Sequence, residues 1–282
     1  MSIFKEDMLK GKHVLITGAG SGLGRQMAVA FSSLGATVSI VGRREEKLKE
    51  TAEIISRNGK VCYYRKCDVR NIDEVRDALS YFASSAGEPN VLVNNAAGNF
   101  ISRTEDLSFN AFNAVIGIVM QGTLHFTLEL GKSWISARRP GTILNIVAGY
   151  ASTGSGYVVP SAIAKAGVLS LTRSLAAEWG KYGIRSTAIS PGIVPTEGSV
   201  SRLAPTEEIQ KMLIDRIPMK RYCTAEELAE LASYLISDAA SFINGDVVTI
   251  DGGEKQWLSG QFNFLDALTP EQWALIKSLR KE

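Results

Sequence analysis

The sequence predicts an α/β fold, a doubly wound parallel β-sheet in a single domain that spans residues 1–282. Short segments rich in β-branched residues alternate with helical segments, and short connections join them, as in parallel sheets covered by helices on both faces. The first predicted strand runs directly into a glycine-rich loop and a helix. We find no internal repeat, low-complexity segment or linker, so we expect one domain with right-handed crossovers.

The composition is that of an ordinary globular protein, with 45% hydrophobic and 21% charged residues. A formal net charge of +2 gives no reason to expect a nucleic-acid partner. No uninterrupted apolar run approaches the roughly 18 residues of a membrane span. The N-terminal segment MSIFKEDMLKGK resembles neither a signal peptide nor a transit peptide, so we expect a cytoplasmic protein, bacterial rather than organellar.

The three cysteines and two histidines form no pattern typical of disulfide frameworks or zinc sites. Cys62 and Cys67 fall on one predicted strand, five residues apart, and should therefore point to opposite faces of it. We expect packed thiols, as in a reducing cytosol, and no metal.

The glycine-rich loop follows the first predicted strand, residues 12–17, and precedes a helix that ends at Gly35. In this setting glycines let the backbone turn tightly and approach a pyrophosphate, whose charge meets the helix N-terminus. A plain tight turn is the alternative, but the order of strand, loop and helix favours a dinucleotide site. The predicted cofactor contacts in this segment are Thr17, Gly18, Gly20, Ser21, Gly22, Leu23 and Gly24.

Arg43 follows the second predicted strand, residues 36–41, about twenty residues past the glycines. An NAD-binding protein would place an acid there to hold the ribose 2′-hydroxyl, whereas an arginine suits a 2′-phosphate. Glu45 and Glu46 follow, but they open the next helix, where acids favour the positive end of the helix dipole. We therefore predict that Arg43 binds the 2′-phosphate of NADPH, the alternative being a solvated surface charge.

The remaining segments continue the alternation towards the C-terminus. Strands are predicted over 61–69, 91–99 and 142–148, in a segment ending at 196 and over 246–253, and a helical segment interrupted near Gly117 and Gly122 covers about 108–137. A glycine-rich loop after the fifth strand leads into a helix that Pro160 opens. Residues 197–222 are polar, are predicted to be irregular, and form a candidate lid over the substrate.

The C-terminal extension, residues 254–282, should end in a further helix. Thr269 and Gln272 predict the N-cap and the capping-box partner of this helix. Trp273 and Leu279 lie on one apolar face, which we expect to be buried, for instance against a neighbouring subunit.

The chain resembles the short-chain dehydrogenase/reductase superfamily in its segments TGxxxGxG, NNAAG, PGxxxT and DGG. The resemblance implies a Rossmann-like fold, a homotetramer and a nicotinamide cofactor whose ribose hydroxyls bind Lys165. The further cofactor contacts that it implies are Asp68, Val69, Asn95, Ala96, Pro191, Gly192, Ile193 and Thr196. Three positions depart from the superfamily, because Ser161 stands in place of its catalytic tyrosine, Ala148 in place of its serine and Val119 in place of its asparagine.

A narrower resemblance accounts for these departures. The segments NNAAGNFISRTEDLS, YASTGSGYVVPSAIAKAG and DGGEKQWLSGQFN are similar to the mitochondrial 2,4-dienoyl-CoA reductases, and the likeness extends over nearly the whole chain. It implies NADPH-dependent reduction of a 2,4-dienoyl-CoA to a trans-3-enoyl-CoA in unsaturated fatty-acid β-oxidation. Tyr150 and Asn99 would donate hydrogen bonds to the dienolate oxygen, and Ser161 and Lys165 would hold a water that returns a proton at C2. The substrate contacts that the resemblance implies are Arg70, Phe100, Ser108 and Arg202.

Several alternatives stay open at this point. Tyr150 could be a packing aromatic at a strand end, and Asn99 could be a turn former. Tyr157 precedes Pro160, which favours an extended backbone at residue 159, so Tyr157 should lie off the helix. One rival hypothesis is an enoyl-thioester or carbonyl reductase that uses Tyr157 as its acid. Another is a catalytically silent NADPH-binding protein, consistent with the loss of the usual serine, tyrosine and asparagine.

Overall fold

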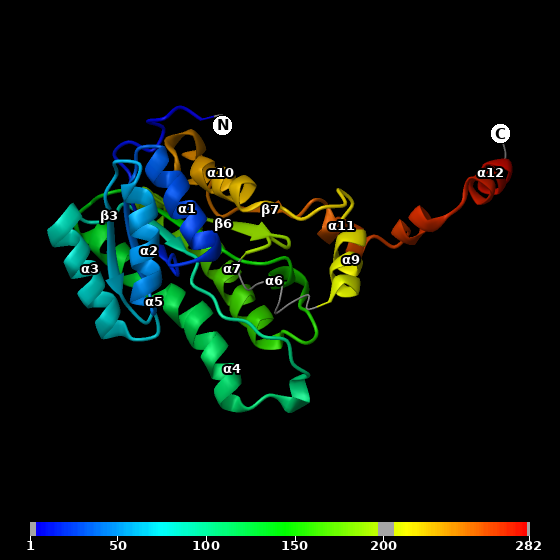
Figure 1. Ribbon diagram of the computed structural model, residues 1–282, viewed down its shortest axis with the longest axis horizontal. Coiled ribbons are helices and arrows are strands. Elements are labelled where there is room, and N and C mark those ends of the chain that lie inside the picture. The colour runs from blue at the N-terminus through cyan, green and yellow to red at the C-terminus, as the bar shows by residue number, and fades with distance from the viewer. Residues whose placement is uncertain (1–3, 197–205, 281–282) are drawn as a thin grey trace.

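The computed structural model describes residues 4–196 and 206–280, and it contains a seven-stranded sheet in the order β3-β2-β1-β4-β5-β6-β7 (Figure 1). The strands are β1 (His13–Thr17), β2 (Thr37–Gly42), β3 (Cys62–Lys66), β4 (Val91–Asn94), β5 (Gly141–Ile146), β6 (Ile184–Pro191) and β7 (Val247–Ile250). Every pairing is parallel. The strand order reverses between β1 and β4, which confirms the predicted doubly wound sheet.

Helices cover both faces of the sheet and form two large apolar clusters with it. The helices are α1 (Gly22–Ser33), α2 (Glu45–Ser56), α3 (Ile72–Ala86), α4 (Phe109–Ile116), α5 (Gly122–Ser136), α6 (Tyr150–Thr153), α7 (Val159–Trp179), α9 (Glu207–Asp215), α10 (Ala225–Ile236), α11 (Glu254–Ser259) and α12 (Pro270–Ser278). On one face Phe31 of α1 packs with α2 and α10. On the other, Phe82 of α3 and Trp134 of α5 pack with Trp179 of α7.

The long helical segment of residues 109–136 is continuous, because a π-turn at Gly117–Gln121 joins α4 to α5. The interruption predicted near Gly117 and Gly122 is therefore a change of winding rather than a break. By length and composition this helix could cross a membrane. However, Phe126, Leu130 and Trp134 are buried against the sheet, which is the ordinary arrangement of a core helix.

Several predicted boundaries are wrong, and the strands predicted over 91–99, 142–148 and 246–253 end at Asn94, Ile146 and Ile250. The third strand ends at Lys66, so Cys67 lies past it, where the chain turns towards α3. Residues 197–222 are not irregular throughout, because α9 forms within them; residues 197–205 lie outside the described part. The Thr206 side chain accepts a hydrogen bond from Ile209 N, and this N-cap is a helix-start signal that the sequence already carries.

A series of hydrogen bonds between buried amide and hydroxyl side chains joins β4 and β5 to α5 and α7. Asn94 of β4 donates to Asn145 Oδ1 of β5 at 2.9 Å and to Thr127 Oγ1 of α5 at 3.0 Å. Asn145 in turn donates to Thr172 Oγ1 of α7 at 2.9 Å. The two asparagines are also paired in the strand register. Since the low local dielectric strengthens such bonds, the network fixes β4 and β5 relative to α7.

The C-terminal extension leaves the body of the protein after α11 (Figure 1, orange to red). The N-cap of α12 is Thr269, and its capping box with Gln272 is formed as predicted. No residue of α12 is buried within the described chain, and the apolar side chains Trp273 and Leu279 are exposed. The predicted burial of this apolar face therefore does not occur within one copy of the described chain.

The buried amide network should make a measurable contribution to stability. Replacing Asn145 by alanine removes the partners of Asn94 and Thr172 at once, so we expect the free energy of unfolding to fall by about 2 kcal/mol or more. Urea denaturation followed by circular dichroism measures this change. The matched control Asn113→Ala lies on an exposed face of α4 and should change it by less than about 0.5 kcal/mol. Equal losses in the two variants would contradict the assignment.

The buried His13 predicts acid sensitivity of the fold. Its Nε2 lies 2.7 Å from Ser39 Oγ, and burial lowers the pKa of His13 to about 4. His13 takes up its proton near pH 6.5 in the unfolded chain but only near pH 4 in the folded chain. Its contribution to the free energy of unfolding is therefore fully present above pH 6.5. It should decline by up to about 3 kcal/mol as the pH falls to 4. Urea denaturation at several pH values across this range measures the free energy of unfolding. In His13→Gln this free energy should fall less steeply as the pH decreases, and an equally steep fall would refute the assignment.

Candidate active site

A cavity of about 1000 Å³ opens at the carboxyl ends of the strands, where the strand order reverses. It is lined by the segments that follow β1, β2, β4, β5 and β6. Most predicted site residues therefore meet in one place. Those that line the cavity are Gly18, Gly20, Ser21, Leu23, Arg43, Asp68, Val69, Asn95, Ala96, Asn99, Tyr150, Lys165, Pro191, Gly192, Ile193 and Thr196.

The glycine loop is held tightly against the segment after β4. The φ of Gly18 is +69°, and a Cβ on it would lie 2.9 Å from Ala96 Cα, so only glycine suits this position. Thr17 does not line the cavity, but its hydroxyl accepts hydrogen bonds from the backbone amides of Asn95 and Ala96, both at 3.0 Å. Gly24 likewise lies behind the cavity, in close contact with Asn95. These residues support the cavity wall.

The N-terminus of α1 fits a dinucleotide phosphate. Its N-cap, Ser21, makes no side-chain capping hydrogen bond, so the first-turn amides are left to a ligand. Gly20 and Ser21 line the cavity beside them, whereas Gly22 packs near Thr196. Free amides at a helix N-terminus beside a loop without bulky side chains are what a pyrophosphate requires.

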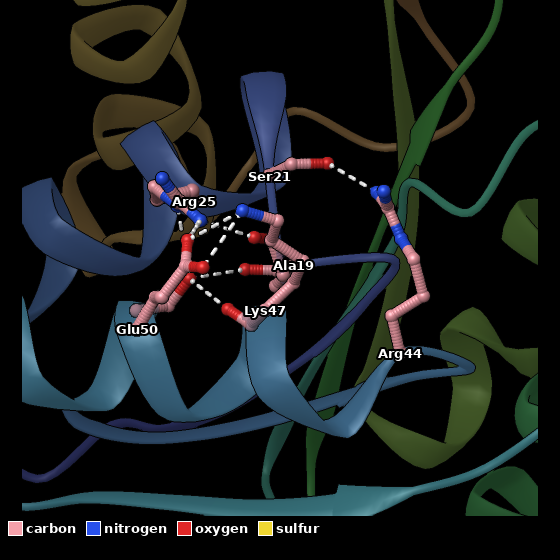
Figure 2. A network of polar contacts seen from close by, with 8 residues as sticks. Ala19, Ser21, Arg25, Arg44, Lys47 and Glu50 are labelled. Atoms are coloured by element: carbon pink, nitrogen blue, oxygen red, sulfur yellow. Dashed lines mark hydrogen bonds and ion pairs between the residues drawn. The ribbon is translucent and has the colours of Figure 1, made fainter.

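Two arginines line the cavity beyond α1, at the end of β2. Arg43 and Arg44 are both exposed, and Arg44 Nη2 donates to Ser21 Oγ at 3.3 Å (Figure 2). Lys47 also lines this end, but Glu50 holds its ammonium at 2.7 Å. The sequence predicted a role for Arg43 only, whereas the structure shows that Arg44, the next residue, lines the cavity as well.

Asp68 and Val69, which follow β3, line the same end of the cavity. The Asp68 carboxylate is in an ion pair with Arg70 at 2.5 Å, and this hydrogen bond lowers the pKa of Asp68. Arg70 itself does not line the cavity. The predicted acyl-CoA contact of Arg70 therefore competes with an existing ion pair.

Three functional groups gather where β5 ends and α7 begins. Tyr150, the first residue of α6, has its hydroxyl 3.0 Å from Ser161 Oγ, and Ser161 is 2% exposed. Burial raises the pKa of the Tyr150 phenol, an effect that the Ser161 hydrogen bond opposes. One turn along α7, the Lys165 ammonium donates to the carbonyl oxygen of Ile146, and burial lowers the pKa of Lys165 to about 8.

Asn99, in the segment after β4, lines the same cavity as Tyr150 and Lys165. Its Oδ1 accepts a hydrogen bond from Phe100 N at 2.9 Å, which orients the carboxamide. Within the described chain its NH₂ group has no hydrogen-bond partner, so it can donate into the cavity. Ala148 also lines the cavity, whereas Val119 is buried in an apolar cluster. Neither of them can supply a proton.

Tyr157 lies away from this group. It is in the turn before α7 with a φ of +64°, its side chain is 65% exposed, and it does not line the cavity. Its predicted position off the helix is confirmed. The rival hypothesis that uses Tyr157 as the acid has no support from this geometry.

The predicted acyl-CoA contacts are not brought together. Phe100 is 38% exposed outside the cavity, and Ser108 caps α4 by accepting from Ala111 N at 3.1 Å. Arg202 lies outside the described residues. Their contacts with substrate stay predictions. Further residues of α9, of α11 and near them line the cavity and were not predicted from the sequence, namely Leu213, Arg216, Tyr222, Glu254, Lys255, Leu258 and Ser259.

Comparisons with known proteins agree with this site. The family model described as enoyl-(acyl carrier protein) reductase matches residues 18–255. A probable 2,4-dienoyl-CoA reductase of Bacillus subtilis, named as (2E)-enoyl-CoA-producing, is 44% identical over 89% of this chain and 98% of its own. One of Caenorhabditis elegans, named as (3E)-enoyl-CoA-producing, is 40% identical over 98% of this chain and 92% of its own.

Among solved structures, a short chain dehydrogenase from Bacillus anthracis superposes with a TM-score of 0.79. It is 43% identical in sequence, and the match covers 86% of this chain and 96% of that one. The glycine loop, the cavity at the strand ends and these likenesses agree. The chain therefore belongs to the short-chain dehydrogenase/reductase family of nicotinamide-dependent oxidoreductases.

Proposed function

We propose that the protein reduces 2,4-dienoyl-CoA thioesters with NADPH. The observation that carries the proposal is that Tyr150, Asn99 and Lys165 line one cavity. Ala148 and Ser161 stand at the positions where a carbonyl reductase of this family has its acids. The relatives from Bacillus subtilis and Caenorhabditis elegans support the same reaction class.

The residues that would hold the cofactor are those of the glycine loop, Arg43 and Lys165. When bound, reduced nicotinamide supplies a hydride, in this reaction to C5 of the dienoyl group. Negative charge then develops on the thioester oxygen, and hydrogen-bond donors aimed at that oxygen stabilise the transition state. The Tyr150 hydroxyl and the Asn99 NH₂ group are these donors in our proposal.

The hydrogen bond between Tyr150 and Ser161 determines how the phenol is used. Either hydroxyl can be the donor. Since Tyr150 must keep its proton for the enolate, Ser161 donates to the Tyr150 oxygen and leaves the phenolic hydrogen free to turn into the cavity. Burial raises the pKa of Tyr150, so the phenol stays protonated at neutral pH. Lys165, held by the Ile146 carbonyl, would orient the cofactor ribose.

The position of the returning proton decides the product. Protonation of the dienolate at C2 gives a 3-enoyl thioester, and protonation at C4 gives a 2-enoyl thioester. The relatives from Caenorhabditis elegans and Bacillus subtilis are named for these two different products. We propose C2, through a water held by Ser161 and Lys165, and hence a trans-3-enoyl-CoA. The homotetramer, the bacterial cytoplasm and a role in β-oxidation stay predictions.

Removing one hydrogen-bond donor to the enolate should slow turnover without weakening cofactor binding. For Tyr150→Phe and for Asn99→Ala we expect kcat on 2,4-hexadienoyl-CoA to fall about a hundredfold or more, because one such donor contributes about 3 kcal/mol. NADPH oxidation is followed by absorbance, and proton NMR of the product distinguishes the 3-enoyl from the 2-enoyl thioester. Tyr157→Phe is the control and should keep full activity. Activity lost only in Tyr157→Phe would overturn the proposal, and a 2-enoyl product would overturn protonation at C2.

Coenzyme preference should depend on Arg43. Removing its charge in Arg43→Ala should raise the KM for NADPH about tenfold or more and leave the KM for NADH nearly unchanged, because only NADPH carries the 2′-phosphate. The control Arg57→Ala removes an exposed arginine from the far end of α2 and should alter neither KM. Equal effects on both coenzymes would show that Arg43 does not read the phosphate.

A further inference from the structure

The first helix of the C-terminal extension, α11, lines the cavity along one face. Glu254, Lys255, Leu258 and Ser259 all line it, and their spacing of one and four residues places them on neighbouring turns of the same face. Gln256, on another face, is exposed. The extension is thus part of the cavity wall before it leaves the body of the protein.

An ion pair joins α11 to α9. Arg216, at the end of α9, donates to Glu254 Oε1 from Nε at 2.6 Å and from Nη2 at 2.5 Å. The Glu254 side chain is only 9% exposed, so its charge is neutralised mainly by Arg216. Leu213, one turn before Arg216, lines the cavity from α9. The two walls therefore hold a fixed spacing.

Lys255 brings a positive charge to this wall. Its backbone amide donates to Asp251 Oδ2 at 2.9 Å, and Gly253 N donates to Asp251 Oδ1 at 2.9 Å, which fixes the start of α11. In the described chain the Lys255 ammonium has no ion-pair partner. Arg216 and Lys47 also line the cavity, but each of them is in an ion pair. Lys255 is half-buried and lines the cavity, and a cation in such a place suits an anionic ligand group.

The position of Lys255 separates it from the cofactor phosphates. Arg43 follows β2 and α11 follows β7, five strand positions apart in the sheet order. With about 4.8 Å between neighbouring strands, this is on the order of 20 Å. The uncapped N-terminus of α1 and Arg43 serve the dinucleotide at one side of the cavity. Lys255 therefore lines the cavity at the side of β7, away from Arg43.

We propose that Lys255 binds a phosphate group of the acyl-CoA substrate, so that α11 is the thioester-binding wall of the site. The inference rests on the proposed function, because it assigns the anion to the substrate of that reaction. Among the predicted substrate contacts, Arg70 does not line the cavity and is already in an ion pair with Asp68, whereas Lys255 lines the cavity.

The test compares two thioesters, of which only the CoA thioester carries phosphate groups, together with the adenosine of CoA. We expect Lys255→Gln to raise the KM for 2,4-hexadienoyl-CoA about tenfold and to leave the KM for the hexadienoyl thioester of pantetheine unchanged, because pantetheine carries no phosphate. Lys255→Arg should restore most of the affinity. The control Lys277→Gln, on exposed α12, should change neither KM. An equal effect of Lys255→Gln on both substrates, or no effect on either, would overturn the proposal.

A binding measurement separates this proposal from the proposed function. Isothermal titration of free CoA into the NADPH complex should show about tenfold weaker binding in Lys255→Gln than in the parent protein. If neither thioester is reduced but CoA binding still depends on Lys255, the reduction is wrong and the phosphate site stands. If the thioester is reduced and CoA binds equally to both proteins, only the assignment of Lys255 is wrong.

Discussion

The hydrogen bond between Asn94 and Asn145 sets the geometry on which the site depends. These residues are paired in the register of β4 and β5, and their side chains are joined at 2.9 Å in the core. Five residues after Asn94 comes Asn99, and five residues after Asn145 comes Tyr150. The two donors proposed for the enolate therefore follow adjacent strands, each five residues after one of the two joined asparagines. The link from Asn145 to Thr172 ties the same point to α7, which carries Ser161 and Lys165.

The reaction that the cavity can support depends on the positions where this chain lacks the polar residues usual in the superfamily. Ala148 and Val119 cannot protonate an alkoxide, and Val119 instead completes an apolar cluster with residues of α7. Ser161 is too short to replace a tyrosine at the same place, but it reaches the Tyr150 phenol, which enters from α6 instead. In the proposed reaction the hydrogen-bond donor is thereby displaced from the usual acid position while Lys165 is kept. A conjugated thioester needs this displacement, since its negative charge develops far from the carbon that accepts hydride.

The sequence predicted the parts of the fold that depend on local rules. The order of strand, glycines and helix placed the loop correctly, and the capping box at Thr269 formed as expected, because both patterns involve residues close in the chain. The sequence alone did not predict that Arg70 would be paired with Asp68. It also did not predict that α11 would line the cavity, because that depends on where β7 ends relative to β5 and β6. The helix α9 could have been found from its N-cap, Thr206.

The ion pair between Arg216 and Glu254 joins α9 to α11, two elements that come late in the chain. All of the predicted coenzyme contacts precede α9 in the sequence. Variation in α9 and α11 therefore leaves those residues unchanged. With α11 as the proposed thioester-binding wall, gene lineages that share this architecture can diversify the thioesters they accept by altering α9 and α11 while the coenzyme contacts stay the same.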